Sequence, residues 1–392
     1  MQFSQMMSEI SPNILAKLED RRREIVAAGG QAVNLSAGTP DMPPDRHVME
    51  ALSQASLVPE NYQYAIKDSL ELLQSAADWY RRRFQVALEP DQICSLYGSQ
   101  EGIAHIAFPL CDAGDVVLAP NPCYPVFHFG PWMRGCDVQY MPLLQENRYI
   151  IDLEGISPSL AHRAKMMIVS YPNNPTTACA PPDFYERLVH FARKYDILVL
   201  HDNAYCELVL DGQPGGSFLQ TKGAVDVGIE FNSLSKAYNL TGMRMSFALG
   251  NRAVIAALSK LRSQIDYGPF PAIQKAAMAV LNGPQDILER NRTEYRLRRD
   301  ALSRGLREVG WNVPDCDSTM FTWYPIPPQW DNDVDFVWDM IDRAGVIAVP
   351  GSSFGSAGKG YVRFALIQPV SVLAQVAQKI GTMLESAATS RC

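Results

Sequence analysis

One lysine stands in a setting that suits covalent chemistry on a carbonyl compound. Lys236 follows Ser-Leu-Ser at the end of an apolar run and precedes Ala-Tyr-Asn-Leu-Thr-Gly-Met-Arg. A lysine that forms an imine must be neutral part of the time, which requires partial burial and nearby cationic groups. Ser233 and Ser235 supply hydroxyl groups, and Arg244 supplies a planar fork that suits a phosphate dianion. Most lysines at strand ends are solvated, so it is this context that favours imine chemistry.

Two further segments complement such a lysine. Residues 97–102 read Tyr-Gly-Ser-Gln-Glu-Gly, and Ser99 there precedes a helical run whose first N–H groups can bind an anion. Asp202 ends a second apolar run, where its carboxylate could pair with a protonated pyridine nitrogen and make that ring an electron sink. Taken alone, Asp202 would more simply be the N-cap of a following helix.

Three other residues could contact the same ring. Asn174, in Asn-Asn-Pro, and Tyr205, three residues after the aspartate, could donate to a ring oxygen. Tyr124, in Asn-Pro-Cys-Tyr-Pro, could stack on the ring face, although an aromatic residue between prolines more often only packs. The signal lies in the recurrence of such polar clusters, because Asn-Asn-Pro is also an ordinary turn.

The polar clusters follow apolar runs that predict strands. The clearest strands are Val116–Ala119, Met166–Ser170, Ile197–His201 and Val227–Phe231. They show little alternation, as expected for strands covered on both faces of a mostly parallel sheet, and helical runs such as residues 182–195 separate them. Ligands bind at the carboxyl ends of strands in such sheets, so three ends with polar residues predict one site.

The sequence predicts two domains. After about residue 285 a long charged helix, from Asp286 to about Val309, leads into a Pro- and Trp-rich stretch. A helix, the strand-like segment Gly360–Leu366 and a C-terminal helix follow. With 392 residues, we expect a large α/β domain over residues 46–284, with a mostly parallel central sheet flanked by helices. Residues 1–45 and 285–392 would form a smaller α+β domain.

Composition excludes several classes of function. The net charge of −7 argues against a nucleic-acid-binding surface, and the basic run at residues 81–83 is interpreted as a solvated helix face. The eight cysteines form no CxxC pair and fit neither a metal site nor a disulfide framework, which favours a reducing cytoplasm. The N-terminal segment lacks the order of a signal peptide, and no apolar run reaches the ~20 residues that span a membrane. We therefore expect a soluble, cytoplasmic protein without a metal.

Together these segments resemble a known family. The matching words are GSQEGIAH, VLAPNPCYPVF, YPNNPT, HDNAY, IEFNSLSKAYNLTGMR, LNGPQ, VPGSSFG and YVRFAL. Over almost its whole length the chain resembles the class I/II aminotransferases of pyridoxal-phosphate fold type I. It is most similar to the branch typified by LL-diaminopimelate aminotransferase.

The resemblance implies pyridoxal 5′-phosphate as cofactor and assigns residues to it. Lys236 would hold the cofactor as a Schiff base and shuttle the proton, and Asp202 would bind the pyridine nitrogen. The ring contacts would come from Asn174, Tyr205 and Tyr124, with Tyr205 also counted as catalytic. The phosphate would be bound by Ser99, Gln100, Ser233, Ser235 and Arg244.

The resemblance also implies a partner subunit and a substrate pocket. Tyr64 would reach the phosphate of a neighbouring subunit, which makes a homodimer the functional unit. Arg363 would bind the α-carboxylate of the substrate, and Gly38 and Asn174 would line the same pocket. Asp68 stands where the branch tends to carry a glutamate that holds the distal ammonium of diaminopimelate.

Four positions depart from the family pattern near the expected site. Gln100 replaces a frequent lysine, and Ser69, Thr177 and Ser246 each replace a glycine. None of these removes a group needed to bind the cofactor, but serine and threonine are strained where glycine adopts positive φ. The departures leave two readings open, neutral drift and a changed substrate or reaction.

Three functions remain to be weighed. The first is transfer of an amino group between an α-amino acid and a 2-oxo acid. The second is β- or γ-elimination, replacement or cyclisation of an amino acid that bears a leaving group, as in specialised biosynthesis. The third is a catalytically silent binding module, against which the intact Lys236, Asp202 and Arg363 argue.

Overall fold

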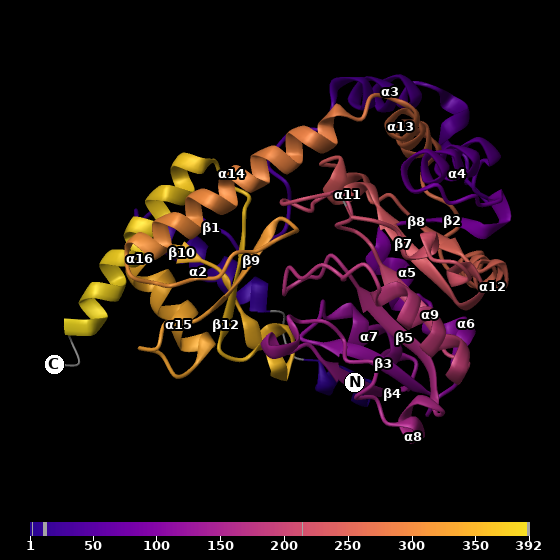
Figure 1. Cartoon of the computed structure of the whole chain (residues 1–392). Helices are drawn as coiled ribbons and strands as arrows, with labels where there is room; N and C mark the ends of the chain where they lie inside the picture. The colour runs from indigo at the N-terminus through magenta and orange to yellow at the C-terminus, as the bar shows by residue number, and fades with distance from the viewer. Residues whose placement is uncertain (2, 11–13, 214, 390–392) are drawn as a thin grey trace. The chain divides into compact units, whose positions relative to one another are not determined.

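The computed structural model describes residues 1, 3–10, 14–213 and 215–389 of the chain, which form two compact units (Figure 1). The large unit consists of Thr39–Arg296 and Cys316–Met320. The small unit consists of Met1–Gly38, Leu297–Asp315 and Phe321–Cys392. The assignment of residues 1–45 and 285–392 to one folding domain stays a prediction.

A seven-stranded sheet forms the centre of the large unit. Its strands run in the order β2-β8-β7-β6-β5-β3-β4. Strand β8 is antiparallel to β2 and β7, and the other neighbours are parallel. The strands are β2 (Ile93–Leu96), β3 (Val116–Asn121), β4 (Asp137–Pro142), β5 (Ala164–Ser170), β6 (Leu198–Asp202), β7 (Gly228–Ser233) and β8 (Ser246–Gly250). The prediction of a mostly parallel sheet, and of four of its strands, is confirmed.

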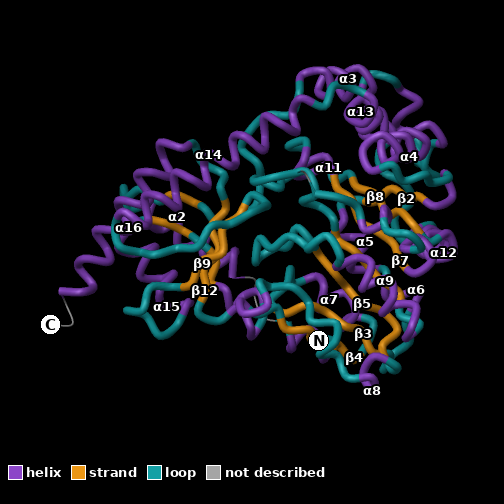
Figure 2. The backbone as a smooth tube through the Cα atoms, in the orientation of Figure 1, coloured by secondary structure: helices purple, strands orange, loops and turns teal. Residues whose placement is uncertain are grey.

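Helices cover both faces of this sheet (Figure 2). One face packs on α5 (Ser99–His105), α6 (Ala107–Leu110), α7 (Val126–Met133) and α12 (Arg252–Arg262). The other packs on α3 (Arg46–Ser56), α4 (Leu70–Phe84), α8 (Pro158–Ala161), α9 (Phe184–Tyr195) and α13 (Pro271–Asn282). Burial on both faces explains why β3, β5, β6 and β7 are mostly apolar rather than alternating.

The small unit is α+β, as expected. Its antiparallel sheet has the order β11-β12-β9, and a short parallel pair joins β1 to β10. The elements are α1 (Gln5–Glu9), α2 (Ile14–Ala27), β1 (Val33–Asn34), β9 (Phe321–Pro325), α15 (Asp333–Asp339), β10 (Val346–Ile347), β11 (Val349–Pro350), β12 (Tyr361–Ala365) and α16 (Val370–Thr389). Helix α14 (Asp286–Glu308) begins in the large unit and ends in the small one. Among the described residues, no helix is both long and apolar enough to cross a membrane.

The basic run at the end of α4 differs from its interpretation as one solvated face. Arg81 forms an ion pair with Asp78 at the surface, as expected. Arg83, however, places Nε 2.7 Å from Oε1 of Glu207, whose side chain is 1% exposed. A buried carboxylate needs a paired cation, so the interpretation is wrong for Arg83.

Candidate active site

The pairing register brings the polar strand ends to one edge of the central sheet. Ser170 at the end of β5 pairs with Asp202 at the end of β6. Ser233 at the end of β7 pairs with Ser246, the first residue of antiparallel β8, and Ser246 also pairs with Leu96 at the end of β2. The segments that follow β2, β5, β6 and β7 therefore start from the same edge, as predicted.

Lys236 lies directly beyond this edge, on the short helix α11 (Leu234–Ala237). Ser233 caps that helix, because its hydroxyl accepts a hydrogen bond of 3.2 Å from the backbone N–H of Ser235. Both serines are buried, whereas Lys236 is half-buried. The lysine thus has the partial burial that imine chemistry requires.

Three buried polar residues, Asn174, Asp202 and Tyr205, form what we call the carboxylate end. Burial raises the pKa of Asp202 to about 6, and the nearby His201 acts in the opposite direction. Oδ1 of Asp202 accepts a hydrogen bond of 3.3 Å from the backbone N–H of Ala204. Residues 204–207 form turns, not a helix, so the simpler N-cap reading of Asp202 is wrong.

Gly98, Ser99, Gln100 and Arg244 form a second cluster, which we call the arginine end. Gly98 has a φ of 88°, and a Cβ placed there would lie 2.1 Å from Nη2 of Arg244. The guanidinium donates to the backbone carbonyls of Thr241 at 3.0 Å and Tyr97 at 3.3 Å. Glycine is therefore required at position 98 for both backbone conformation and space.

Gln100 makes a specific contact in place of a cationic one. Its Oε1 accepts a hydrogen bond of 2.9 Å from the hydroxyl of Tyr124. The amide thereby restrains the phenol ring that the sequence places beside the cofactor.

The departures at residues 68 and 69 have structural roles. Ser69 caps α4 by accepting a hydrogen bond from the N–H of Leu72 at 3.2 Å. Oδ2 of Asp68 accepts from the N–H of Ser95 at 2.8 Å, and Oδ1 accepts from the hydroxyl of Ser95. Both oxygens of Asp68 are thus engaged by strand β2, and its assignment to a substrate stays a prediction.

The other two departures, at residues 177 and 246, are unfavourable in different ways. Thr177 has a φ of 63°, a left-handed conformation that is unusual for a β-branched residue. Ser246 is fully buried, and its hydroxyl has no hydrogen-bond partner among the described residues. Both positions therefore carry a local cost in free energy.

The small unit places Arg363 and Gly38 beside one aromatic ring. The guanidinium of Arg363 lies 4.1 Å from the ring centroid of Phe321 and 4.6 Å from that of Phe354. Its Nη2 donates to the carbonyl of Ser36 at 2.9 Å. A Cβ at Gly38 would lie 2.5 Å from Cζ of Phe321, so glycine leaves room for the ring that supports the arginine.

Tyr64 has a different environment from the other candidates. Its side chain is 84% exposed, and its ring lies 5.8 Å from that of Tyr267. It contributes to the surface of the large unit and not to the buried edge.

A buried pair that no sequence motif predicted lies on the strand of Asp202 and on its neighbour. His201 and Glu230 are register partners on β6 and β7 and are both 0% exposed. Nδ1 of His201 lies 2.9 Å from Oε2 of Glu230. The signal that could have found them is a titratable residue inside an apolar strand, in LVLHD and GIEFNS.

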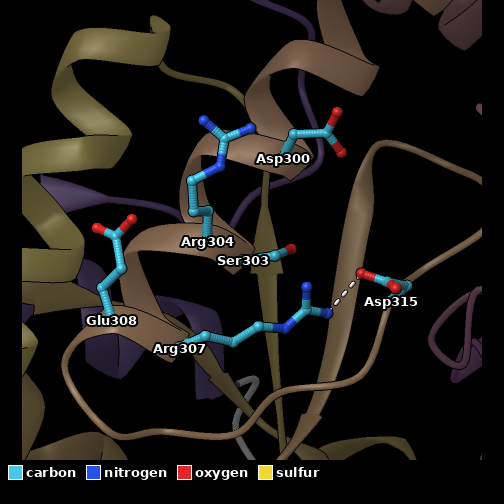
Figure 3. A pocket seen from close by; sticks show the side chains of 6 residues that line it. All are labelled: Asp300, Ser303, Arg304, Arg307, Glu308 and Asp315. Atoms are coloured by element: carbon cyan, nitrogen blue, oxygen red, sulfur yellow. Dashed lines mark hydrogen bonds and ion pairs between the residues drawn. The ribbon is translucent and has the colours of Figure 1, made fainter.

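None of the candidate residues lines the open hollow of the small unit (Figure 3). It has a volume of about 390 Å³, and Arg307 forms an ion pair with Asp315 at its wall. The lining residues are Asp300, Ser303, Arg304, Arg307, Glu308 and Asp315. Because they carry charges of both signs, the hollow shows no preference for an anion or a cation.

The match to a family model covers most of the chain. The model describes aminotransferase class I and II, and it matches residues 31–380. The chain belongs to this family. It is a pyridoxal-phosphate-dependent aminotransferase, which transfers an amino group between an amino acid and a 2-oxo acid.

Individual relatives are similar over nearly their full length. The LL-diaminopimelate aminotransferase of Moorella thermoacetica is 41% identical over 93% of this chain and 94% of the relative. That of Aquifex aeolicus is 37% identical over 97% and 99%. Among solved structures, substrate-bound BacF from Bacillus subtilis is similar with a TM-score of 0.94, at 31% identity over 98% of both chains. A probable N-succinyldiaminopimelate aminotransferase from Thermus thermophilus has a TM-score of 0.89 at 31% identity, over 94% of this chain and all of the other.

The residues at the sheet edge fit pyridoxal phosphate. Asp202 is a buried carboxylate with no ion-pair partner among the described residues, so a pyridinium would complement it. Arg244 is exposed beside Gly98 and the start of α5, where a phosphate can approach without a clash.

Proposed function

We propose that the aminotransferase acts on LL-diaminopimelate or an amino acid similar to it. Relatives of that printed function are 41% and 37% identical over more than nine-tenths of both chains. The structural observation that supports this proposal is the shared sheet edge. The buried carboxylate of Asp202 and the half-buried amine of Lys236 both lie at or directly beyond it.

The carboxylate end binds the cofactor ring. Bound there, the cofactor supplies an electron sink for the electrons of the substrate Cα–H bond. Asp202 would hold the pyridine nitrogen, Asn174 and Tyr205 would donate to the ring oxygen, and Tyr124 would stack on the ring. The half-buried Nζ of Lys236 would hold and move the proton of the substrate Cα.

The arginine end binds the phosphate. Arg244 supplies a bidentate fork, and backbone carbonyls already hold its guanidinium beside Gly98. Hydroxyl and amide groups complete this set, from Ser99, Gln100, Ser233 and Ser235. Restraint of Tyr124 by Gln100 then links the phosphate contacts to ring stacking.

The small unit and Asp68 bind the substrate. Arg363 clamps the α-carboxylate, since its guanidinium is buried between two rings and preorganised for a planar anion. Gly38 and Asn174 line the pocket. Asp68 would reach a distal ammonium only after giving up part of its contact with Ser95.

A second copy of the chain completes the site. Tyr64 reaches the phosphate of the neighbouring subunit, which the exposure of its segment supports. Five large apolar side chains of this segment are mostly exposed: Leu57, Tyr62, Tyr64, Ile66 and Leu70. We place the homodimer in the cytoplasm, in line with the seven free cysteines described.

The test is the absorbance of the purified holoenzyme on addition of one amino acid at a time. An aminotransferase converts the lysine-bound cofactor to its pyridoxamine form, and LL-diaminopimelate should do so at the lowest concentration. Release of a 2-oxo acid or vinyl product with return of the starting spectrum would instead mean elimination or replacement.

Two variants test the residue roles. Lys236→Ala should lower turnover by at least about 10³-fold while the protein stays folded, with exposed Lys222→Ala as the matched control. Arg363→Ala should raise the KM for the amino acid about a hundredfold and leave the cofactor affinity unchanged. Near-normal turnover of the lysine variant, or equal loss of both affinities in the arginine variant, would contradict these roles.

A further inference from the structure

His201 and Glu230 lie directly behind the residue that faces the cofactor. They pair across β6 and β7, with Nδ1 of the imidazole 2.9 Å from Oε2 of the carboxylate. Asp202 follows His201 along β6, and successive side chains of a strand point to opposite faces. The pair and Asp202 are therefore separated by the backbone of one strand, in a region without solvent to screen charge.

Glu230 accepts hydrogen bonds from four groups. Apart from His201, these are the hydroxyl of Tyr80 at 2.7 Å, the hydroxyl of Ser217 at 2.8 Å and the N–H of Phe218 at 2.8 Å. A carboxyl group that only accepts is in its ionised form. Because Glu230 is 0% exposed, that charge is costly unless a cation neutralises it.

The second nitrogen of His201 indicates which cation that is. Nε2 lies 3.0 Å from the hydroxyl of Tyr185, and the same hydroxyl lies 3.3 Å from the carbonyl oxygen of Tyr171. In one arrangement all three groups have a partner: the hydroxyl of Tyr185 donates to the carbonyl of Tyr171 and accepts from Nε2–H of His201. The ring then carries protons on both nitrogens and is an imidazolium.

No other cation takes this role among the described residues. The other titratable groups around the pair are Tyr80, Tyr171, Tyr185, Cys179, Cys206 and Asp202, and Glu207 acts on Cys206. Arg83 acts on Cys206 and is paired with Glu207 at 2.7 Å. His201 is therefore the group that can neutralise the charge of Glu230.

We propose that His201 is an imidazolium that neutralises Glu230, so that Asp202 faces a neutral pair and stays ionised for the pyridine nitrogen of the cofactor. This assignment rests on the proposed function of the sheet edge. His201 is a positioning residue, because it acts through Asp202 and does not touch the cofactor. Without its charge, Glu230 would add a second negative charge beside Asp202.

The directions of the charge effects agree with this geometry. Burial raises the pKa of Asp202 to about 6, His201 lowers it, and Glu230 raises it further. Two charges separated by roughly 7 Å in a protein interior shift a titration by about one to two pH units. Loss of the imidazolium should therefore move the titration of Asp202 into or above the neutral range.

The experiment follows Asp202 in the apoprotein by the ¹³Cγ signal of labelled aspartate, assigned with Asp202→Asn. His201→Gln should raise the midpoint of Asp202 by about one to two pH units. The double variant His201→Gln/Glu230→Gln should return it to the wild-type value, since both charges are then gone. The control is His105→Gln, which removes a half-exposed histidine 3.0 Å from Glu101 and should change nothing.

The rescue separates charge from structure, because damaged packing would not be repaired by a second substitution. An unchanged midpoint in His201→Gln, or no return in the double variant, overturns the proposal. If His201→Gln does not fold, ¹⁵N signals of labelled histidine in the wild-type apoprotein decide, and a singly protonated His201 at pH 7 overturns it. If the wild-type protein fails to bind pyridoxal phosphate, the proposed function falls while the titration result still stands.

Discussion

The two ends of the sheet-edge site are built on different physical principles. The carboxylate end consists of side chains that are 5–7% exposed, at or beyond the ends of central strands. At the arginine end, Gln100 and Arg244 are exposed, and backbone carbonyls and a glycine set the geometry. One end carries an unfavourable buried charge before any ligand arrives, and the other offers a charge that water already solvates. The two ends should therefore respond differently to pH, to an added side-chain atom and to ionic strength.

The largest difference concerns pH and the stability of the apoprotein. The pKa of Asp202 is raised by burial to about 6, from an ordinary value near 4. The folded state binds the additional proton, so stability falls as pH rises from about 4 to 6, by about 3 kcal/mol in total. Asp202→Asn should remove this loss and be about 3 kcal/mol more stable than wild-type apoprotein at pH 8.

Urea unfolding of both apoproteins at pH 4 and pH 8 measures this effect. The advantage of the asparagine variant should disappear at pH 4, where the wild-type carboxyl group is largely neutral. A pH-independent difference would mean that burial does not penalise the Asp202 charge.

Space is the limiting factor at the arginine end. Gly98→Ala puts a Cβ 2.1 Å from Nη2 of Arg244 and leaves alanine at a φ of 88°. We expect a loss of about 2 kcal/mol in stability and at least about tenfold weaker cofactor binding. Fluorescence titration of the apoprotein with pyridoxal phosphate gives the affinity. Gly242→Ala is the matched control, because no atom lies within 4 Å of the added Cβ, and equal effects of the two would refute the steric argument.

Ionic strength should also affect ligand binding at the two ends differently, although the effect is smaller than those above. Raising the ionic strength from about 0.05 to 0.5 M shortens the screening length severalfold, which weakens exposed charge pairs more than buried ones. Binding of pyridoxal phosphate should weaken severalfold, and binding of pyridoxal, which lacks the phosphate, should hardly change. Equal salt dependence of the two ligands would contradict an exposed phosphate contact.

The smallest effect concerns strain in the loop that carries Asn174. Thr177 has a φ of 63°, so Thr177→Gly should stabilise the protein by about 1 kcal/mol. The neighbour Thr176 is the control, since its hydroxyl donates to Oδ1 of Asn173 at 2.7 Å and Thr176→Gly should destabilise. Thermal unfolding of both variants tests the pair, and a loss of stability in Thr177→Gly would show that the threonine side chain contributes more than its backbone strain costs.

Local patterns made much of the fold predictable. Mostly apolar runs identified β3, β5, β6 and β7, because strands covered on both faces bury nearly all of their side chains. Polar residues at their ends then predicted the shared edge at which Asp202 and Lys236 lie, because parallel strands have their carboxyl ends at one edge. Both inferences need only neighbours in sequence and a general rule of topology.

Contacts between distant segments were not predictable in the same way. The side chain of Arg83 contacts Glu207, and Asp68 is bound by Ser95, through pairings that no local period encodes. Glu230 lies inside an apolar strand, and only the register of β6 and β7 reveals His201 as its partner. The close approach of Arg244 to Gly98 likewise depends on a turn far along the chain.

Because of that close approach, the residue tolerated at position 98 depends on the residue at position 244, and the reverse also holds. A side chain at residue 98 would displace the guanidinium of Arg244. With a shorter residue at 244 the steric need for glycine at 98 would disappear, and only its positive φ would still favour glycine. Substitutions at the two positions should therefore be non-additive, each masking the harm of the other. A mutational search that changes one residue at a time would find both sites intolerant and miss the combinations in which the pair changes together.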